Sequence, residues 1–323
     1  MGVIERYRDR LPVHPDTPAL TLGEGSTPLV AAPKLSEVLG VELYLKCEGS
    51  NPTGSFKDRG MVVSVAKALE AGAEGIVCAS TGNTAASAAA YAARAGLSAV
   101  VLYPSGAVAE AKQAQARAAG ARVLEVRGSF DDALRACLEL AGRGFALVNS
   151  LNPSRIEGQK TAAFEIIEQL GRSPDVVALP YGGGGNLRAY AKGFDEAGEH
   201  PRLIAGEAAD RVSTMASAIR ISDPAHAGAI EDLVAADRVE IVPLDDEQLS
   251  SAWLELASLE GIFCEPASAA GLAALKQVEH PEGTVAVCVV TGHGLKDTRA
   301  VDLLYGEATV VEPRLEAILA EVR

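Results

Sequence analysis

Short runs of apolar, largely β-branched residues alternate along this chain with alanine-rich segments whose polar residues recur at helical spacing. Residues 75–80 (GIVCAS) form one apolar run, and residues 84–96 (TAASAAAYAARAG) follow it with a helical pattern that ends at a glycine. Further helices are predicted over 107–120 and 131–143. The other predicted strands are 98–104, 121–128, 145–150, 175–180, 202–207, 238–244 and 284–292. Continuous apolar strands separated by helices are typical of parallel sheets covered on both faces, so an α/β fold is predicted.

The strand–helix alternation occupies two stretches, residues 57–150 and residues 151–323. A chain of 323 residues is also longer than one hydrophobic core usually supports. We therefore expect two parallel-sheet α/β lobes. Residues 1–56 are expected to join the second stretch, because one domain can be inserted into another at a surface loop.

Composition narrows the possible partners. The formal net charge of −14 disfavours nucleic acid and anionic membranes as partners. The five cysteines are widely separated, with no CxxC pair and no zinc-type spacing, which predicts reduced thiols in a cytoplasmic protein and no metal site. The N-terminus has no apolar signal segment, and the longest apolar stretch is far below the roughly 20 residues that span a bilayer. A small-molecule ligand is expected.

Three loops at predicted strand ends are rich in glycine and hydroxyl side chains: residues 80–84 (STGNT), 181–190 (YGGGGNLRAY) and 291–297 (TGHGLKD). Ligands of open α/β sheets bind at such ends. The four consecutive glycines 182–185 favour an anion cradle of backbone N–H groups. The STGNT loop suits a carboxylate or phosphate at a helix start, although a capped glycine turn accounts for it equally well. Thr291 can contact a ring nitrogen or cap the next element. His293 can contact a substrate, or it can be a capping or surface histidine.

Lys57 follows a turn-forming run in NPTGSFKDRG (51–60) and begins a predicted helix. Gly49 and Gly54 have the spacing of a P-loop, but the lysine comes two residues too late for that motif. A helix N-terminus lowers the pKa of an amine and favours the neutral nucleophile that a Schiff base needs. A nucleophilic lysine, a cradle for one phosphate and a hydroxyl for a ring nitrogen together indicate a pyridoxal 5'-phosphate site.

A dinucleotide site is a weaker alternative. The fingerprint G-x-G-x-x-G fails because Leu187 or Arg188 stands where its third glycine belongs. Glu207 does follow the next predicted strand at about the distance of a ribose-binding acid. The alternative of a nicotinamide-dependent oxidoreductase is therefore weakened rather than removed.

Taken in chain order, six motifs resemble the fold-type II (tryptophan synthase β-like) pyridoxal-phosphate enzymes: NPTGSFKDRG, STGNT, NPSRIEGQKTAAFEI, GGGGN, FCEPASAAGLAAL and TGHGLKD. The resemblance covers roughly residues 20–300. SFKDRG, NPxRxEGQK and TGHGLKD resemble the threonine synthases in particular. This resemblance implies a homodimeric lyase that converts O-phospho-L-homoserine and water into L-threonine and phosphate. It also implies a large cofactor-binding domain (1–56 and 151–323) and a smaller, mobile substrate-binding domain (57–150).

The resemblance implies roles for individual residues. Lys57 is expected to bind the cofactor covalently and later to move protons. The other expected cofactor contacts are Asn83, Gly182, Gly183, Gly184, Gly185, Asn186 and Thr291. Residues expected to hold the substrate carboxylate or phosphate are Ser80, Thr81, Thr84, Asn149, Ser150 and Arg155.

The nearest alternative within the family is a threonine or serine dehydratase. Those enzymes usually carry a serine–glycine loop in place of TGHG, and they need no arginine for a substrate phosphate, the role implied for Arg155. The chain also departs from the family in two places: Gly183 stands where an asparagine is common, and the stretch 202–220 is shorter.

Overall fold

The computed structural model describes residues 1–106, 110–306 and 308–322. Its strands are β1 (Leu29–Ala31), β2 (Glu42–Cys47), β3 (Gly75–Ala79), β4 (Ser98–Pro104), β5 (Arg122–Val126), β6 (Phe145–Leu147), β7 (Val176–Pro180), β8 (Arg202–Ala208), β9 (Val239–Leu244) and β10 (Val285–Val290). Its α-helices are α1 (Val3–Arg6), α2 (Pro33–Leu39), α3 (Lys57–Glu70), α4 (Asn83–Ala95), α5 (Glu110–Ala118), α6 (Phe130–Ala141), α7 (Pro153–Gln159), α8 (Thr161–Leu170), α9 (Gly185–Glu196), α10 (Ala227–Ala235), α11 (Asp246–Glu260), α12 (Ala270–Leu275), α13 (Arg299–Tyr305) and α14 (Leu315–Glu321).

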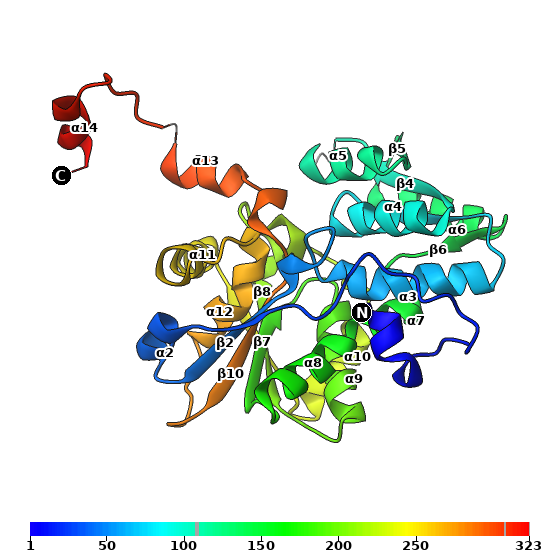
Figure 1. Cartoon of the computed structure of the whole chain (residues 1–323), viewed down its shortest axis with the longest axis horizontal. Helices are drawn as coiled ribbons and strands as arrows, with labels where there is room; N and C mark the ends of the chain where they lie inside the picture. The colour runs from blue at the N-terminus through cyan, green and yellow to red at the C-terminus, as the bar shows by residue number, and fades with distance from the viewer. Residues whose placement is uncertain (107–109, 307, 323) are drawn as a thin grey trace.

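The strands form two sheets, one of six strands in the order β1-β2-β10-β7-β8-β9 and one of four strands in the order β5-β4-β3-β6. Every neighbouring pair is parallel except β1 and β2, which are antiparallel. Figure 1 shows the two sheets as separate lobes, with helices packed around each. The predicted fold of two parallel-sheet α/β lobes is confirmed.

Both faces of the six-stranded sheet are covered, which explains why its central strands are apolar throughout. Val177 and Leu179 of β7 pack into a cluster with α8, α9 and α10, whereas Ala178 packs into a cluster with α2, α11 and α12. The same alternation occurs in β3, where Ile76 faces α3 and α4 while Val77 faces α6. Side chains of a strand point to opposite faces in turn, so a strand buried on both sides has no polar position.

The N-terminal segment contacts both lobes. Strand β2 pairs with β10 and so extends the six-stranded sheet. The side chains of Val3 and Ile4 in α1 instead pack with apolar residues of α3 and α4. The division of the chain into domains at residues 56/57 and 150/151 stays a prediction.

Most predicted elements occur at their predicted places. Helix α4 ends at Gly96, which has a φ of +71°. Strand β6 ends at Leu147, so residues 148–152 form a loop where a strand end was expected. The helix predicted over 107–120 is described from Glu110 onward, and its first three residues lie outside the described residues. In the described ranges no helix combines the length and the apolar character that a membrane crossing requires.

Candidate active site

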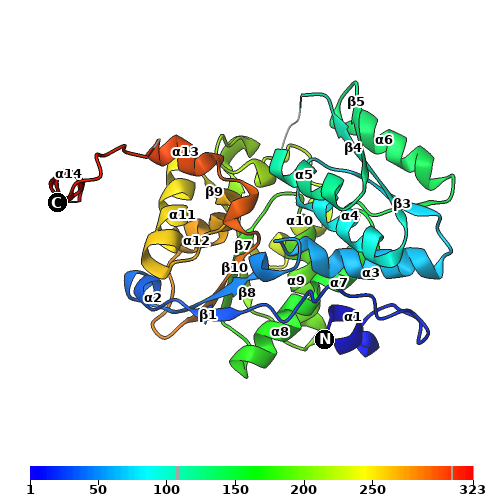
Figure 2. The same cartoon turned by 45° about the horizontal axis from the view of Figure 1, so that its top comes forward.

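The loops that follow β3, β6, β7 and β10 lie at the carboxyl ends of these strands, and the segment that carries Lys57 joins them. The backbone N–H of Phe56 donates to the carbonyl of Thr291 over 3.0 Å. The N–H of His293 donates to the carbonyl of Gly54 over 2.9 Å. These two bonds fix the start of α3 against the end of β10, a region that both views display between the lobes (Figures 1 and 2).

Asp58 anchors the first turn of α3 on the side of the smaller sheet. Its carboxylate accepts hydrogen bonds from the N–H and hydroxyl of Thr53, at 2.7 and 2.6 Å, and from the hydroxyl of Ser87 in α4 at 2.5 Å. An acid at the beginning of a helix is also stabilised by the helix dipole. The acid that follows Lys57 in the sequence therefore holds the turn that presents the amine.

Arg59 anchors the same turn on the side of the larger sheet. Its guanidinium forms ion pairs with Glu48 and Glu165, both at 2.7 Å, and Lys46 pairs with Glu165 at 2.9 Å. All four side chains are at most 1% exposed. We call Lys46, Glu48, Arg59 and Glu165 the buried ion cluster. Its two cations and two anions balance, as buried charges require.

Lys57 itself is half-buried, with its ammonium nitrogen 4.4 Å from the centre of the Phe56 ring. Burial and, to a smaller extent, the cationic Arg155 lower the pKa of Lys57 to about 7 against an opposing effect of Glu265. The lowered pKa predicted from the sequence is confirmed. Its main cause is burial rather than the helix N-terminus on which the sequence argument relied.

The four-glycine loop contains successive backbone N–H groups that the described residues leave without an acceptor. Helix α9 begins at Gly185, and among the described residues the backbone N–H groups of Gly183, Gly184, Gly185 and Asn186 have no acceptor. The side-chain amide of Asn186 is 8% exposed and likewise lacks a partner for its nitrogen and its oxygen. Gly184 has a φ of +82°, which only glycine adopts readily. This arrangement suits a phosphate at a helix N-terminus.

The STGNT loop lies at the start of α4, as predicted. Asn83 donates from its amide to Glu265 over 2.6 Å, and its buried amide oxygen has no partner among the described residues. The hydroxyl of Ser80 accepts from the N–H of Gly82 over 3.1 Å. Thr81 and Thr84 are half-buried beside it.

Asn149 and Arg155, two of the residues predicted to bind the substrate phosphate, have different surroundings in the structure. Asn149 clamps a strand end: its amide oxygen accepts from the N–H of Ala79, and its nitrogen donates to the carbonyl of Ala79, both over 3.0 Å. Arg155 is 1% exposed and donates to the carbonyl of Val148 over 3.0 Å, and its Nε has no partner in the part of the chain that the structure describes. No carboxylate in the described part of the chain forms an ion pair with it.

Burial lowers the pKa of Arg155 to about 10, so the guanidinium remains charged at neutral pH. A buried cation without an anionic partner is costly, and a bound anion would relieve that cost. Arg155 also contacts the lysine helix, because a Cβ built at Gly60 would lie 2.9 Å from its Nε. The structure therefore packs a buried cation against the helix that begins with Lys57, close enough to influence the pKa of its amine.

Thr291 directly follows β10 and shares a hydrogen bond of 2.9 Å with the hydroxyl of Ser268. Ser268 also accepts from the N–H of Gly292 over 2.9 Å. Sequence reasoning missed Ser268, and it missed Glu265, which pairs with Lys112 over 2.6 Å as well as with Asn83. Both lie within the FCEPASAAGLAAL motif, which marked the region without indicating a role for either side chain.

The sequence left a ligand contact open for Glu207 and for His293. In the structure both side chains interact with other residues of the chain. Glu207, which stands at the distance of a ribose-binding acid, pairs with Arg211 over 2.7 Å. His293 accepts from the N–H of Leu295 over 3.2 Å and so caps a short turn. Capping was one of the two roles considered for this histidine.

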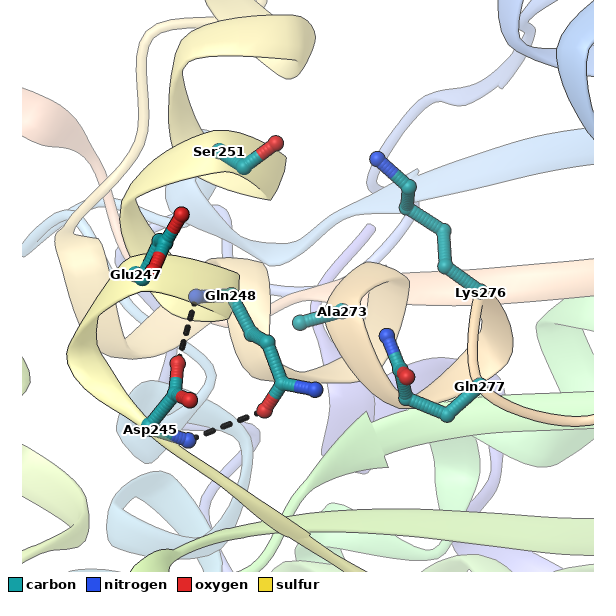
Figure 3. A pocket seen from close by; sticks show the side chains of 7 residues that line it. All are labelled: Asp245, Glu247, Gln248, Ser251, Ala273, Lys276 and Gln277. Carbon is teal, nitrogen blue, oxygen red and sulfur yellow. Dashed lines mark hydrogen bonds between the residues drawn. The ribbon is translucent and has the colours of Figure 1, made fainter.

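A pocket of about 220 Å³ between α11 and α12 lies outside this group (Figure 3). Asp245 and Gln248, which line it, bond to one another at the start of α11, and Lys276 pairs with Glu255. These side chains stabilise the helices. A second depression, of about 410 Å³, lies at the turn that precedes Lys57 in the chain. Thr53 and Lys296 are among the residues that line it.

Two α/β lobes with a lysine, a glycine cradle and a threonine at their strand ends define a fold-type II pyridoxal-phosphate enzyme. The family model described as "Pyridoxal-phosphate dependent enzyme" matches residues 20–292. The chain is 47% identical to the threonine synthase of Halalkalibacterium halodurans over 317 residues, 92% of this chain and 90% of that protein. It is 48% identical to the threonine synthase of Mycobacterium tuberculosis over 324 residues, 92% and 89% of the two chains. The solved structure of maize serine racemase superimposes with a TM-score of 0.77 at 22% identity, covering 94% and 96% of the chains.

The chain thus belongs to the threonine synthases within the family of pyridoxal-phosphate-dependent enzymes. Its residues fit that cofactor on structural grounds alone. The unpaired N–H groups of 183–186 suit the phosphate, and the neutral amine of Lys57 suits a carbonyl carbon. The unpaired amide oxygen of Asn83 suits a ring hydroxyl. The hydroxyl of Thr291 suits a ring nitrogen.

The cofactor-free protein is expected to bind pyridoxal 5'-phosphate covalently at a rate that rises with pH and is half-maximal near pH 7. Only the neutral amine attacks, and the pKa of Lys57 is lowered to about 7. Replacing Arg155 with methionine removes a cation that lowers this pKa, so the midpoint should move to higher pH. Stopped-flow absorbance at a series of pH values measures both. A native midpoint near that of free lysine, about 10.4, would contradict the argument.

Proposed function

We propose that this chain converts O-phospho-L-homoserine and water into L-threonine and phosphate. The single observation that carries the proposal is Arg155, a buried guanidinium that lowers the pKa of Lys57 and for which the described residues supply no carboxylate partner. A substrate that brings its own dianionic phosphate supplies the missing counter-charge, and a planar guanidinium binds phosphate through two parallel hydrogen bonds. An unphosphorylated hydroxy amino acid leaves the cation unpaired.

The remaining substrate contacts follow from the two loops beside Arg155. Ser80, Thr81 and Thr84 offer hydroxyls at the start of α4, where the helix dipole favours the substrate carboxylate. Ser150 stands near the substrate phosphate. Asn149 fixes the loop through Ala79 and in this way positions its neighbours.

Four groups orient the cofactor in this proposal. The backbone of 182–186 holds its phosphate, Asn83 its ring hydroxyl and Thr291 its ring nitrogen, while Lys57 binds it covalently. When bound, the cofactor withdraws electrons from the substrate carbon next to the amino group. A threonine hydroxyl, unlike an aspartate, does not keep the ring nitrogen fully protonated, which favours elimination and water addition over amino transfer.

Lys57 would transfer protons at the substrate while the cofactor is bound. Its amine has a pKa near 7, so at neutral pH it can accept a proton from substrate carbon and return it without a large penalty. Asp58 and Arg59 hold the helix start from opposite sides and keep the amine within reach. The Arg155 cation attracts the departing phosphate in the same region.

The larger-scale organisation is part of the proposal. The large domain (1–56 and 151–323) binds the cofactor, and the smaller domain (57–150) moves over the substrate. A cytoplasmic homodimer is proposed, and exposed apolar residues of the C-terminal segment support contact with a second copy. Helix α14 lies away from both sheets (Figure 1), and Leu315 and Ile318 on it are 66% and 43% exposed.

The proposal is tested by incubating purified, cofactor-loaded protein with O-phospho-L-homoserine. Phosphate and L-threonine should appear in equal amounts, because one molecule of each leaves per turnover. Formation of 2-oxobutanoate from threonine is measured alongside with the same enzyme. Faster deamination of threonine than release of phosphate would replace the proposed function with a dehydratase.

A further inference from the structure

The segment between β8 and α10, residues 209–226, wraps the outer side of the glycine loop. A Cβ built at Gly182 would lie 3.1 Å from the carbonyl oxygen of Ala218. One built at Gly184 would lie 3.1 Å from the Cβ of His226, and one at Gly185 would lie 3.3 Å from its ring. The segment therefore packs against the loop along most of its length.

This segment also binds the loop carbonyls. Arg211 donates from Nη1 to the carbonyl of Gly182 over 3.3 Å, and the N–H of His226 donates to the carbonyl of Gly183 over 3.2 Å. In a trans peptide the N–H points opposite to the C=O, and the described residues contain no cis peptide. Holding the carbonyls of 182 and 183 outward thus points the N–H groups of Gly183 and Gly184 toward the cradle.

Arg211 is itself held in place. It forms an ion pair with Glu207 at 2.7 Å, and its guanidinium lies 4.5 Å from the centre of the Tyr181 ring. Asp210 and Arg211 both have positive φ, of 52° and 56°, which residues other than glycine rarely adopt. Such a conformation persists where surrounding contacts impose it, and it occurs most often at functional sites.

His226 extends the contact to the other anion-binding loop. Its Nε2 lies 3.0 Å from the carbonyl of Ser150, and its Nδ1 lies 3.3 Å from Nη1 of Arg188. A carbonyl only accepts and an arginine only donates, so Nε2 carries the proton and Nδ1 accepts. The ring is buried and neutral in this arrangement. It connects the glycine loop to the loop that carries Ser150 and leads to Arg155.

We propose that Arg211 and His226 are positioning residues that orient the phosphate cradle, and that His226 also couples the cradle to the substrate-phosphate loop at 149–155. The inference rests on the proposed role of 182–186 in holding the cofactor phosphate. Neither side chain contacts the reacting atoms, and both act through the backbone that they hold.

The test measures the dissociation constant of pyridoxal 5'-phosphate for cofactor-free protein, together with the KM for O-phospho-L-homoserine. Arg211→Ala should raise the dissociation constant about tenfold, the effect of one lost hydrogen bond at the upper end of its range, and leave KM unchanged. His226→Ala should raise both quantities, because it loses the packing on the cradle and the bond to Ser150. His226→Gln keeps a donor in place of Nε2 and should recover most of the KM.

Matched controls separate positioning from a general loss of stability. Arg238 has the same 23% side-chain exposure as Arg211 and pairs with Asp195, away from the cradle. His280 donates from Nε2 to a backbone carbonyl, that of Leu275, as His226 does to Ser150. Arg238→Ala and His280→Ala should lower the thermal midpoint of the cofactor-free protein as much as their counterparts do, yet bind the cofactor with native affinity.

The possible results distinguish a failure of the proposed phosphate cradle from a failure of the positioning role of Arg211 and His226. Gly184→Val tests the cradle itself, because a side chain there requires the neighbouring atoms to move. Native cofactor affinity in Gly184→Val would refute the cradle and the inference with it. Weak binding in Gly184→Val with native binding in Arg211→Ala and His226→Ala would refute only the positioning role. If the alanine variants fail to fold, Arg211→Met decides: it keeps an apolar stem beside Tyr181 but removes the donor to Gly182, so the inference requires about a tenfold loss of cofactor affinity, and native affinity would overturn it.

Discussion

Replacing Lys57 with alanine is expected to abolish the covalent attachment of the cofactor and to reduce turnover by a factor on the order of 10⁴, the upper range for losing a proton-transferring group. Lys57 is the amine at the convergence of the strand ends, and burial and Arg155 lower its pKa to about 7. The visible spectrum of the purified variant and its rate of phosphate release measure the two effects.

The matched control for this experiment is Lys67→Ala on the same helix. Lys67 is 37% exposed and pairs with Glu70, so its loss should leave spectrum and rate close to native. Reduction of the native enzyme with borohydride, followed by peptide mapping, identifies the modified lysine directly. A label found on a lysine other than Lys57 would show that the catalytic amine has been assigned to the wrong residue.

Replacing Arg155 with alanine is expected to leave the spectrum of the bound cofactor intact and to remove most turnover of O-phospho-L-homoserine. The loss should be about 2–4 kcal/mol of transition-state stabilisation, typical of one strong electrostatic donor. Steady-state kinetics of phosphate release measure it. Arg155→Lys should recover only part of the rate, since an ammonium lacks the planar pair of donors.

A substrate without phosphate provides the control for Arg155. Deamination of serine or threonine does not need the guanidinium, so its slow rate should change little in Arg155→Ala. Equal losses on phosphorylated and unphosphorylated substrates would mean that Arg155 only supports the loop through its bond to Val148. The comparison thus separates a substrate contact from a packing role within one variant.

The sequence predicts the fold well because its strands are buried on both faces. A strand such as β7 has no polar position, and its ends are marked by Pro180 and the glycines beyond. The end of β6 was less predictable. Apolar Val148 continues the pattern of FALVNS, but strand pairing with β3 ends at Leu147, and Asn149 binds back to Ala79 through its side chain. Such a side-chain contact depends on a neighbouring strand and leaves no periodic signal.

The candidate site was predictable where a local motif carries the chemistry, as with Lys57 and the glycine loop. Its supporting residues were not. Glu265 and His226 come from segments far from these motifs in the chain, and only the packing of β10 and α10 brings them to the site. A single acid or histidine in a sequence gives no indication of the partner it will meet.

The buried ion cluster restricts how this sequence can change. Removing one member leaves an opposite charge buried without a partner. This typically lowers the free energy of unfolding by about 3–5 kcal/mol, a large part of the 5–15 kcal/mol that stabilises a typical protein. Exchanging an entire pair for apolar residues costs far less. Single substitutions at Lys46, Glu48, Arg59 or Glu165 are therefore expected to yield poorly folded variants, whereas paired replacements should be tolerated, so the helix that begins with Lys57 can change only together with distant β2 and α8.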